Sequence, residues 1–466
     1  MKSSPKNPKS IVSVAVDRLF GDRSYVVQTD SQDLSKLLIL YGDNGSGKTT
    51  ILRMIYSLLS PARKGGFKTF LSKTPFASFS VTFADGTTMS AVRPPGEVLG
   101  SFELALTYAN GSSVSIALKA DADLSIKQQG EAEERRYDQF LTLVRNLGIA
   151  LYYLSDDRRL QTIHLPESAA DQEEEVTFNV ASGIRVFHER IRDHYTTERL
   201  VFDEREPRGV SLQPTVYAFE TWARKHALRA STVGEGNANT IYTDLIRSIT
   251  SAYQRDVGIH EQPRLEELRV RLMSLAERSI TFTRLGLMSP PQVTELTAAL
   301  DLVGPSSQLI VRSVLEPYVR GLEVRISALQ ELHDSLTTFL GNLNELYRGK
   351  RVEFNLREGL KILTPDGRLL NYESLSSGEK QLLVLLCNTL IARDQTSIFV
   401  IDEPELSLNV KWQRSLVRTL LECVAGTAVQ FVLATHSIEL LSAYDNSVVH
   451  LQPVEWPLLN AAQSTS

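Results

Sequence analysis

A glycine-rich octapeptide separates an apolar run from an apolar, helix-forming segment, and it reads Gly42-Asp43-Asn44-Gly45-Ser46-Gly47-Lys48-Thr49. This is the full pattern of a phosphate-binding loop, placed between an expected strand at 36–40 and an expected helix at 49–59. Its glycines let backbone N–H groups converge on phosphate oxygens at the positive end of a helix dipole. A chance glycine turn is the alternative, and the intact pattern disfavours it.

The side chains of this loop have distinct expected roles. Lys48 reaches the β- and γ-phosphates, and the hydroxyl of Thr49 supplies a ligand to Mg²⁺. We expect ATP and Mg²⁺ as the ligands. The expected nucleotide-binding residues of the loop are Gly42, Asn44, Gly45, Ser46, Gly47, Lys48, Thr49 and Thr50.

A second segment suited to a phosphate site is the apolar run 398–401, which ends in Asp402 and Glu403. We expect Asp402 to hold the Mg²⁺ shell and Glu403 to orient and deprotonate the attacking water. A strand end with two solvated carboxylates is the structural alternative. The phosphate-binding loop in the same chain favours the catalytic interpretation.

Two further segments carry less information when each is taken alone. Ser376, Ser377 and Gly378 open an apolar helix, where hydroxyls and free N–H groups create an anion site or an ordinary helix cap. His436 follows the expected strand 428–434, and a lone histidine at a strand end is more often structural than catalytic.

Together, these segments resemble the motifs of ABC-type ATPases: Walker A at 42–49, the signature motif at 375–379, Walker B at 402–403 and the switch histidine at 436. In that family two heads dimerise face to face. The resemblance therefore implies that Ser376 and Gly378 act on ATP held by the partner head. It also implies that His436 senses the γ-phosphate within its own head.

The same resemblance predicts a glutamine that closes the first lobe of the head. Gln161 is the candidate, with an ordinary surface glutamine as the alternative. Tyr25 is a candidate for stacking on adenine, although an ordinary strand tyrosine is favoured.

The order of patterns predicts an α/β fold in three parts. Residues 1–161 form the Walker A lobe with an antiparallel β subdomain, residues 162–346 form a helical insertion, and residues 347–466 return to β/α character. Asp85-Gly86 and Asn110-Gly111 mark hairpin turns in the first part. We thus expect one ABC ATPase head with a mixed sheet, interrupted by helices.

A heptad stripe runs through the insertion from Leu315 to Tyr347, with steps of four and three residues. A shorter stripe runs from Leu265 to Leu275. These stripes predict a short antiparallel coiled-coil hairpin with its turn near 286–291. An ordinary amphipathic helix in a bundle is the alternative.

The length of the insertion indicates the branch of the family. Lys48 and Gly378 lie about 330 positions apart, a layout that resembles SMC, Rad50, RecF and OLD ATPases (AAA15/AAA21-like) rather than transporter cassettes. Glu379 stands where transporters usually carry glutamine, and 402–408 resembles the extended Walker B of RecF- and OLD-like proteins. Asn409 replaces the usual histidine, which leaves the geometry of the following D-loop open.

The composition of the chain bears on its binding partners and its cellular location. The 466 residues carry a net charge of −5, which gives no overall basic field for nucleic acid, and two cysteines cannot build a disulfide framework. We find no signal-peptide pattern and no run of roughly 18 apolar residues. We expect a cytoplasmic protein that meets a membrane only through a partner.

The resemblance implies ATP hydrolysis at a head–head interface, and it extends to the ATPase subunits of the PARIS and Septu anti-phage systems. Our leading hypothesis is a homo-oligomeric sensor and scaffold that holds and releases a separately encoded effector nuclease of the Toprim or HNH type. A phage-encoded protein would be the trigger. Because the chain ends soon after Val449, we expect no nuclease domain on it.

The alternative function is an SMC/RecF-like ATPase that clamps DNA during repair or chromosome maintenance. It predicts DNA-stimulated hydrolysis with a steep salt dependence. A transporter cassette is a third candidate, which the long insertion disfavours.

Overall fold

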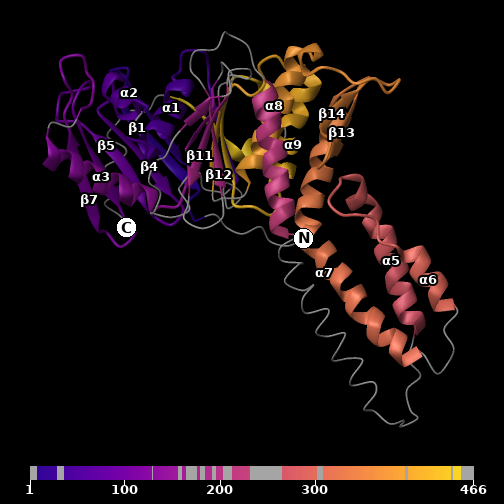
Figure 1. Cartoon of the computed structure of the whole chain (residues 1–466). Coiled ribbons are helices and arrows are strands. Elements are labelled where there is room, and N and C mark those ends of the chain that lie inside the picture. The colour runs from indigo at the N-terminus through magenta and orange to yellow at the C-terminus, as the bar shows by residue number, and fades with distance from the viewer. Residues whose placement is uncertain are drawn as a thin grey trace. The chain divides into compact units, whose positions relative to one another are not determined.

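The computed structural model describes most of the chain, in two compact units. It covers residues 8–28, 36–63, 65–127, 130–155, 160–163, 176–178, 184–190, 196–202, 212–230, 265–301, 308–393, 397–441 and 444–452. One unit joins Met1–Val210 to Ser376–Ser466, and the other is Ser211–Leu375 (Figure 1). The first unit therefore contains both motif-bearing ends of the chain.

The central sheet of the first unit has the order β17-β3-β16-β15-β8-β9. Neighbouring strands from β17 to β8 are parallel, and β9 pairs antiparallel with β8. These strands read as nearly unbroken apolar runs because both faces of the sheet are covered. Their bounds are β3 (Leu37–Tyr41), β8 (Ala150–Leu154), β9 (Leu160–Ile163), β15 (Ser397–Asp402), β16 (Gln430–Thr435) and β17 (Val448–His450).

A second, antiparallel sheet has the order β2-β1-β4-β5-β6-β7. Gly86 and Gly111 have φ angles of 80° and 82° in its turns, so the predicted antiparallel β subdomain is present. The strands are β1 (Ile11–Leu19), β2 (Arg23–Gln28), β4 (Ser78–Phe83), β5 (Thr88–Val92), β6 (Phe102–Thr107) and β7 (Ser113–Leu118). Two helices accompany it, α2 (Phe67–Lys73) and α3 (Glu131–Arg145).

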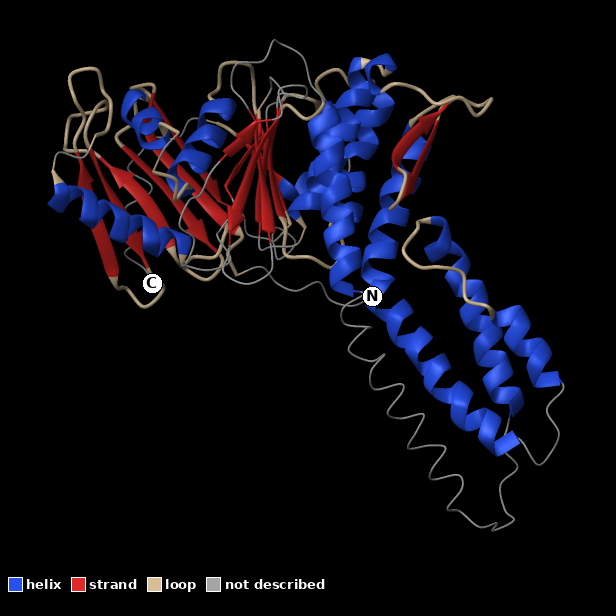
Figure 2. Ribbon diagram, viewed as in Figure 1, coloured by secondary structure: helices blue, strands red, loops and turns tan. Residues whose placement is uncertain are grey.

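The core of this unit lies around α1 (Lys48–Leu59), which contacts strands of both sheets (Figure 2). Alternate residues of the parallel strands, such as Val400 and Val432, join the apolar cluster around α1. Gln430 ties the sheets together, because its side chain bonds both N–H and C=O of Ile11 at 2.7 and 2.9 Å. Helix α1, which begins at the phosphate loop, thus packs against the parallel sheet on one side and the antiparallel sheet on the other.

The remaining elements of this unit follow the insertion or lead into it. Helix α8 (Ser377–Ala392) contacts both β15 and α9 (Val410–Cys423), and almost all of its residues are buried. Short elements follow at α10 (Ile438–Leu441) and η4 (Asp445–Ser447). A separate antiparallel sheet contains β10 (Val176–Phe178), β11 (Ile184–Arg190) and β12 (Thr196–Phe202).

The second unit is mostly helical. Residues 212–230 form a helix, followed by α5 (Leu265–Arg284), α6 (Val293–Asp301) and α7 (Gln308–Leu346). A hairpin of β13 (Arg351–Asn355) and β14 (Gly359–Leu363) and the turn η3 (Tyr372–Ser374) complete it. The predicted combination of antiparallel and parallel sheets with a helical insertion is confirmed.

The predicted pairing of the two stripes is wrong, because α5 runs parallel to α7. Arg271 contacts Glu323, Arg278 contacts Gln330 and Thr281 contacts His333, so the partner number rises along both helices. The antiparallel neighbour of α5 is α6, where Asp301 pairs with Arg269. The stripes identified buried faces correctly, but a heptad pattern carries no information about the direction of its partner.

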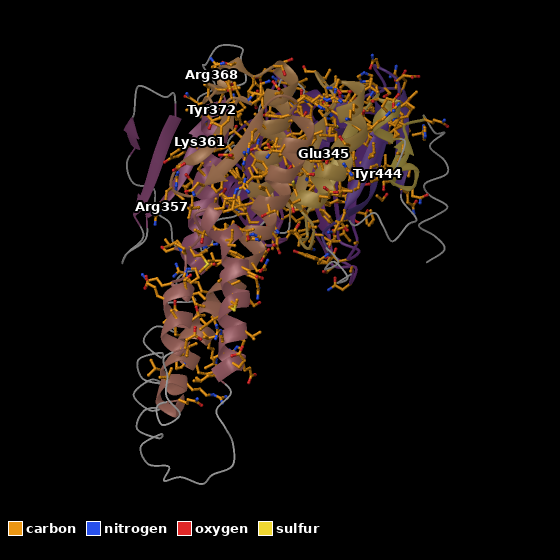
Figure 3. All side chains as sticks on the ribbon, turned by 90° about the vertical axis from the view of Figure 1, so that its right-hand side faces the viewer. Glu345, Arg357, Lys361, Arg368, Tyr372 and Tyr444 are labelled. Atoms are coloured by element: carbon orange, nitrogen blue, oxygen red, sulfur yellow. The ribbon has the colours of Figure 1, made fainter. Side chains whose placement is uncertain are left out.

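The unit boundaries differ from the expected 161/162 and 346/347. The β13–β14 hairpin belongs with the helices, because the Asn344 side chain bonds the backbone of Val352 in both directions. Figure 3 shows Lys361 and Tyr372 on this part of the chain, where the Tyr372 hydroxyl donates to the carbonyl of Leu360. Among the described residues, no helix combines the length and hydropathy needed to cross a bilayer.

Candidate active site

Three of the expected motifs meet at one edge of the parallel sheet. Tyr41, which precedes the phosphate loop, lies opposite Thr435, and Asp402 lies opposite Ala434. Strand β16 lies between β3 and β15 in the sheet, and adjacent strands are about 4.8 Å apart. Because carboxyl ends of parallel strands share an edge, residues 42–49, 402–403 and 436 converge there.

The phosphate loop has the backbone shape that its glycines allow. Gly45 and Gly47 have φ angles of 80° and 93°, in the left-handed region that other residues avoid. Gly42 leaves room for the loop, since a Cβ there would lie 3.0 Å from the Ser46 hydroxyl oxygen. That hydroxyl is buried and finds no hydrogen-bond partner among the described residues, although it lies in the loop where an anion is expected.

Lys48 is the buried cation of this loop. It is 5% exposed, and its Nζ donates to the carbonyls of Gly42 and Asp43 at 2.7 and 3.1 Å. Thr49 and Asn44 are exposed, and Thr50 is partly buried. The ammonium therefore stands inside the loop, while the Thr49 hydroxyl is accessible to a ligand.

The β1–β2 turn adds two residues that the sequence analysis missed. Arg23 donates to the carbonyl of Gly45 at 2.6 Å, and the ring of Phe20 lies so close to Gly47 that a Cβ there would approach it to 3.1 Å. Phe20 is 44% exposed, whereas Tyr25 is 2% exposed in the core. The favoured interpretation of Tyr25 as a strand residue therefore agrees with the structure, and Phe20 is the accessible aromatic residue at the loop.

The acids at the end of β15 occupy different surroundings. Asp402 is fully buried at the last position of the strand. Glu403 has a φ angle of 45°, which is rare for a residue other than glycine, and its N–H donates to the Ala434 carbonyl at 2.9 Å. Such strain is concentrated at functional sites, where surrounding contacts hold it in place.

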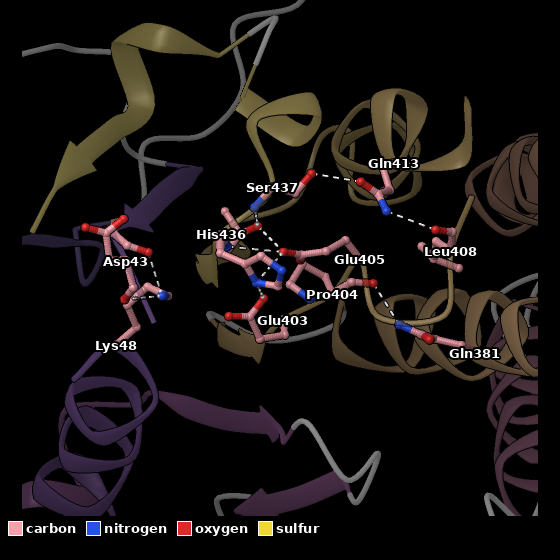
Figure 4. A network of polar contacts seen from close by, with 12 residues as sticks. Asp43, Lys48, Gln381, Glu403, Pro404, Glu405, Leu408, Gln413, His436 and Ser437 are labelled. Carbon is pink, nitrogen blue, oxygen red and sulfur yellow. Dashed lines mark hydrogen bonds and ion pairs between the residues drawn. The ribbon is translucent and has the colours of Figure 1, made fainter. Parts of the chain in front are cut away.

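Glu403 and His436 are in direct contact (Figure 4). Glu403 Oε2 lies 2.5 Å from His436 Nδ1, and Glu405 Oε1 lies 3.6 Å from the same nitrogen. Burial, followed by the neighbouring Glu405, raises the pKa of Glu403 to about 7, and the contact with His436 opposes part of this rise. A carboxyl group that titrates near neutrality is suited to accept a proton from water.

The cluster of Glu403, Glu405 and His436 also has the composition of a metal site, with ligand atoms within 4.8 Å of one another. However, Glu405 Oε1 already accepts bonds from Thr435 and from the His436 backbone. This acid is therefore already engaged as a hydrogen-bond acceptor, which disfavours a metal ion at the cluster.

The signature residues lie at the start of α8. Ser376 is the N-cap, and it forms a reciprocal capping box with Glu379, whose N–H donates to the Ser376 hydroxyl at 3.3 Å. Gly378 has no room for a side chain, because a Cβ would lie 2.6 Å from the Ser407 carbonyl. Gln381 donates to the Pro404 carbonyl at 2.7 Å. The motif thus packs on the loop that follows Glu403, and Ser377 is exposed beside it.

Two other expected residues have simpler surroundings. Gln161 lies on β9, where its backbone pairs with Tyr153, and its side-chain surroundings lie outside the described residues. Asn409 caps α9 by accepting the Trp412 N–H at 3.0 Å. Asparagine therefore starts α9 in place of the family's usual histidine.

The residues present fit ATP with Mg²⁺. The loop offers a buried ammonium, two glycines with positive φ and an unsatisfied buried hydroxyl, all at the start of α1. A buried carboxylate, Asp402, ends the strand two positions away in the sheet, and the loop itself carries the exposed Thr49. Hard oxygen ligands of this kind are those that Mg²⁺ prefers.

Comparison with known proteins agrees with this chemistry. The family model AAA_21, described as "AAA domain, putative AbiEii toxin, Type IV TA system", matches residues 37–442. The DNA double-strand break repair Rad50 ATPase of Sulfurisphaera tokodaii is 26% identical over 154 residues. That alignment covers 32% of this chain and 17% of the relative, so it spans under a fifth of the Rad50 protein.

Solved SMC heads resemble the chain over most of its length but at low similarity. A Pyrococcus furiosus Smc head with an extended coiled coil, bound to the C-terminal domain of ScpA, matches with 12% identity and a TM-score of 0.37, covering 97% of this chain and 98% of that one. The Thermotoga maritima SMC head matches with 13% identity and a TM-score of 0.32, covering 96% and 99%.

Proposed function

Since the chain belongs to the AAA_21 family of P-loop ATPases, we propose that it is an ATP-driven sensor and scaffold of a bacterial defence complex. In this proposal, ATP closes pairs of heads, the closed assembly holds a separately encoded effector nuclease, and a phage-encoded trigger releases it. The family description, which names a toxin system, supports a defence role. The convergence of three motifs at one sheet edge supports the ATPase chemistry on which the role depends.

ATP is bound by the phosphate loop and its neighbours. Lys48 exchanges its bonds with the Gly42 and Asp43 carbonyls for bonds with the β- and γ-phosphates. Thr49 and Asp402 would hold Mg²⁺, which would neutralise charge on the phosphates when bound. Phe20 offers its exposed ring to the base, because it projects from the turn that contacts Gly47.

Hydrolysis requires one residue to activate water and another to sense the γ-phosphate. Glu403 orients the water and accepts its proton, and His436, in contact with that carboxylate, carries the state of the γ-phosphate to the switch loop. Ser376, Ser377 and Gly378 complete the site of the partner head. Burial raises the pKa of the Glu403 carboxyl group to about 7, and this supports its role as the proton acceptor.

A phage-plating assay tests the defence role. Cells carrying this gene with its neighbouring genes are challenged with a phage panel, and Lys48→Ala and Glu403→Gln are tested beside the parent. Protection that both variants abolish supports the proposal. Full protection by Lys48→Ala would show that ATP binding is not part of the activity.

The second candidate is an ATPase that clamps DNA, which the partial similarity to a Rad50 repair ATPase favours. It predicts that duplex DNA stimulates hydrolysis and that the stimulation falls steeply between about 50 and 200 mM salt. The net charge of −5 weighs against it. Hydrolysis unaffected by DNA at low salt would exclude this function.

A further inference from the structure

Glu405 is a buried acid next to the proposed catalytic pair. It is 4% exposed and lies two positions after Glu403. The Leu406 N–H donates to the Glu403 carbonyl at 3.1 Å, and the Leu408 N–H donates to the Glu405 carbonyl at 2.9 Å. These turns fold the segment 403–408 back on itself, so the Glu405 side chain reaches the end of β16.

One carboxylate oxygen of Glu405 anchors two residues of the switch loop 435–437 directly and the third through Thr435. The Thr435 hydroxyl donates to Oε1, and the His436 N–H donates to the same oxygen at 3.2 Å. The Ser437 N–H in turn donates to the Thr435 hydroxyl oxygen at 2.9 Å. The backbone of the loop that carries His436 therefore depends on Glu405.

A second contact joins the same two segments farther out. The Gln413 side chain donates to the Leu408 carbonyl at 2.9 Å and accepts the Ser437 hydroxyl at 2.8 Å (Figure 4). The acidic segment 403–408 and the switch loop are thus tied at both ends. The His436 side chain is 47% exposed, so packing alone does not hold its ring.

We propose that Glu405 is a positioning residue that holds the switch loop, and with it the His436 ring, against Glu403. This inference rests on the proposed ATPase function of the site. Burying a second carboxylate beside Glu403 is costly, which argues that Glu405 is retained for the geometry of the site rather than for stability. Its effect on hydrolysis is transmitted through His436.

Substitutions separate the hydrogen bonds of Glu405 from its charge. Glu405→Ala removes both, and we expect kcat for ATP to fall ~10- to 100-fold while KM changes less than ~2-fold. Glu405→Gln keeps an oxygen for both donors and should recover most of kcat. Thr435→Val removes one anchoring bond without touching the acid, and it should also lower kcat. It takes the place of Glu405→Ala as the test if that variant fails to fold.

The matched control is Glu439→Ala, because Glu439 is a nearby acid that pairs with Arg414. It should leave kcat unchanged. Equal falls of kcat in Glu405→Gln and Glu405→Ala would overturn the positioning role. So would a fall in kcat that is accompanied by a comparable change in KM.

A double-mutant cycle tests the route through His436. In a His436→Ala background, adding Glu405→Ala should lower kcat less than ~3-fold further, because the residue through which it acts is already absent. Losses that multiply would show that Glu405 acts independently of His436 and would refute the inference.

Hydrogen exchange of the nucleotide-free protein makes the test independent of hydrolysis. The His436 and Ser437 amides should exchange at least ~10-fold faster in Glu405→Ala than in the parent or in Glu439→Ala, because their acceptors are lost or displaced. A parent that hydrolyses no ATP would refute the proposed function while exchange still reports on the anchor. Unchanged exchange would refute the inference alone.

Discussion

The His436 Nδ1 atom lies 2.5 Å from the Glu403 Oε2 atom, although the two residues are 33 positions apart. Parallel pairing of β15 with β16 creates this contact, because it places Asp402 opposite Ala434 at the carboxyl edge of the sheet. A half-exposed imidazole and a mostly buried carboxylate thus share one hydrogen bond. A ligand that forms a hydrogen bond with either side chain therefore changes the hydrogen bonding of the other.

We expect Glu403→Gln to separate ATP binding from hydrolysis. The amide cannot accept the proton of the attacking water, so kcat should fall ~10²- to 10³-fold, while the phosphate loop still binds ATP. Steady-state hydrolysis, nucleotide binding and light scattering with ATP should show a slow enzyme in a stable dimer. Lys48→Ala is the comparison, because it should lose ATP binding as well. If Glu403→Gln hydrolysed ATP as fast as the parent, Glu403 would not have its proposed role.

The pH dependence of hydrolysis should report the ionisation of Glu403. Burial raises the pKa of this carboxyl to about 7, and only its ionised form accepts a proton. The ionised fraction rises from roughly one tenth at pH 6 to roughly nine tenths at pH 8, so kcat should increase about tenfold over this range. A flat profile between these values at saturating ATP and Mg²⁺ would contradict the assignment.

Gly378→Ala should disturb the contact between α8 and the loop after Walker B. The added Cβ meets the Ser407 carbonyl at 2.6 Å, and the backbone must shift, at a cost of about 1–3 kcal/mol in the free energy of unfolding. Gly341→Ala is the control, since nothing lies within 4 Å of a Cβ at this other helical glycine. It should stabilise the protein by about 0.5–1 kcal/mol. Equal denaturation midpoints for both variants would refute this account.

Phe20→Ala should weaken nucleotide binding. Loss of an exposed aromatic surface beside Gly47 removes a stacking partner for the base, worth about 1–3 kcal/mol. Titration with ATP should then show a Kd at least about fivefold higher, while inorganic triphosphate, which lacks a base, should bind equally to variant and parent. Unchanged ATP affinity would exclude Phe20 from the base site.

Lys68→Met should destabilise the helix that starts at the phosphate loop. The buried Lys68 ammonium donates to the carbonyls of Ser57, Leu58 and Ser60 at the end of α1, and its removal leaves these acceptors unsatisfied. We expect a loss of about 1–3 kcal/mol in chemical denaturation. Lys73→Met, an exposed residue on the neighbouring α2, should change stability by less than about 0.5 kcal/mol.

The stability lost in Lys68→Met should also depend on pH. Burial lowers the pKa of Lys68 from 10.5 to about 7, so the folded protein releases this proton before the unfolded chain does. The free energy of unfolding of the parent, relative to the Met variant, should therefore rise as the pH increases from 7 to 9. A difference that stays flat over this range would show that the folded state retains the ammonium.

Local patterns predicted much of the fold because they depend on neighbouring residues. Gly45 and Gly47 mark the phosphate loop, and the apolar run before Asp402 marks a buried strand. The heptad stripe on α7 predicted its buried face, including Val319, Ile326 and Leu336. It did not predict that α5 runs parallel to α7, because the same stripe buries equally well against a helix of either direction.

Several members of the site have no local pattern. Phe20 and Gln413 are single residues in a turn and a helix, and nothing around them in the chain indicates a role. Glu405 lies in the segment that resembles an extended Walker B, but that resemblance does not say which groups its side chain contacts. Each is recognised only from a partner far away in sequence, as with Gln413 and Ser437. Tyr25, the adenine candidate, is excluded by burial that depends on the strands packed around it.

The sequence by itself determined the chemistry: a phosphate loop, an acid pair after a buried strand, and a helix opened by small residues, because each pattern is a property of adjacent residues. Only the tertiary structure decided which acids and histidine meet. Strand order and register bring Tyr41, Thr435 and Asp402 to one edge. These pairings join segments 394 positions apart in the case of Tyr41 and Thr435 and 32 apart in the case of Asp402 and Ala434, and no local rule specifies either contact.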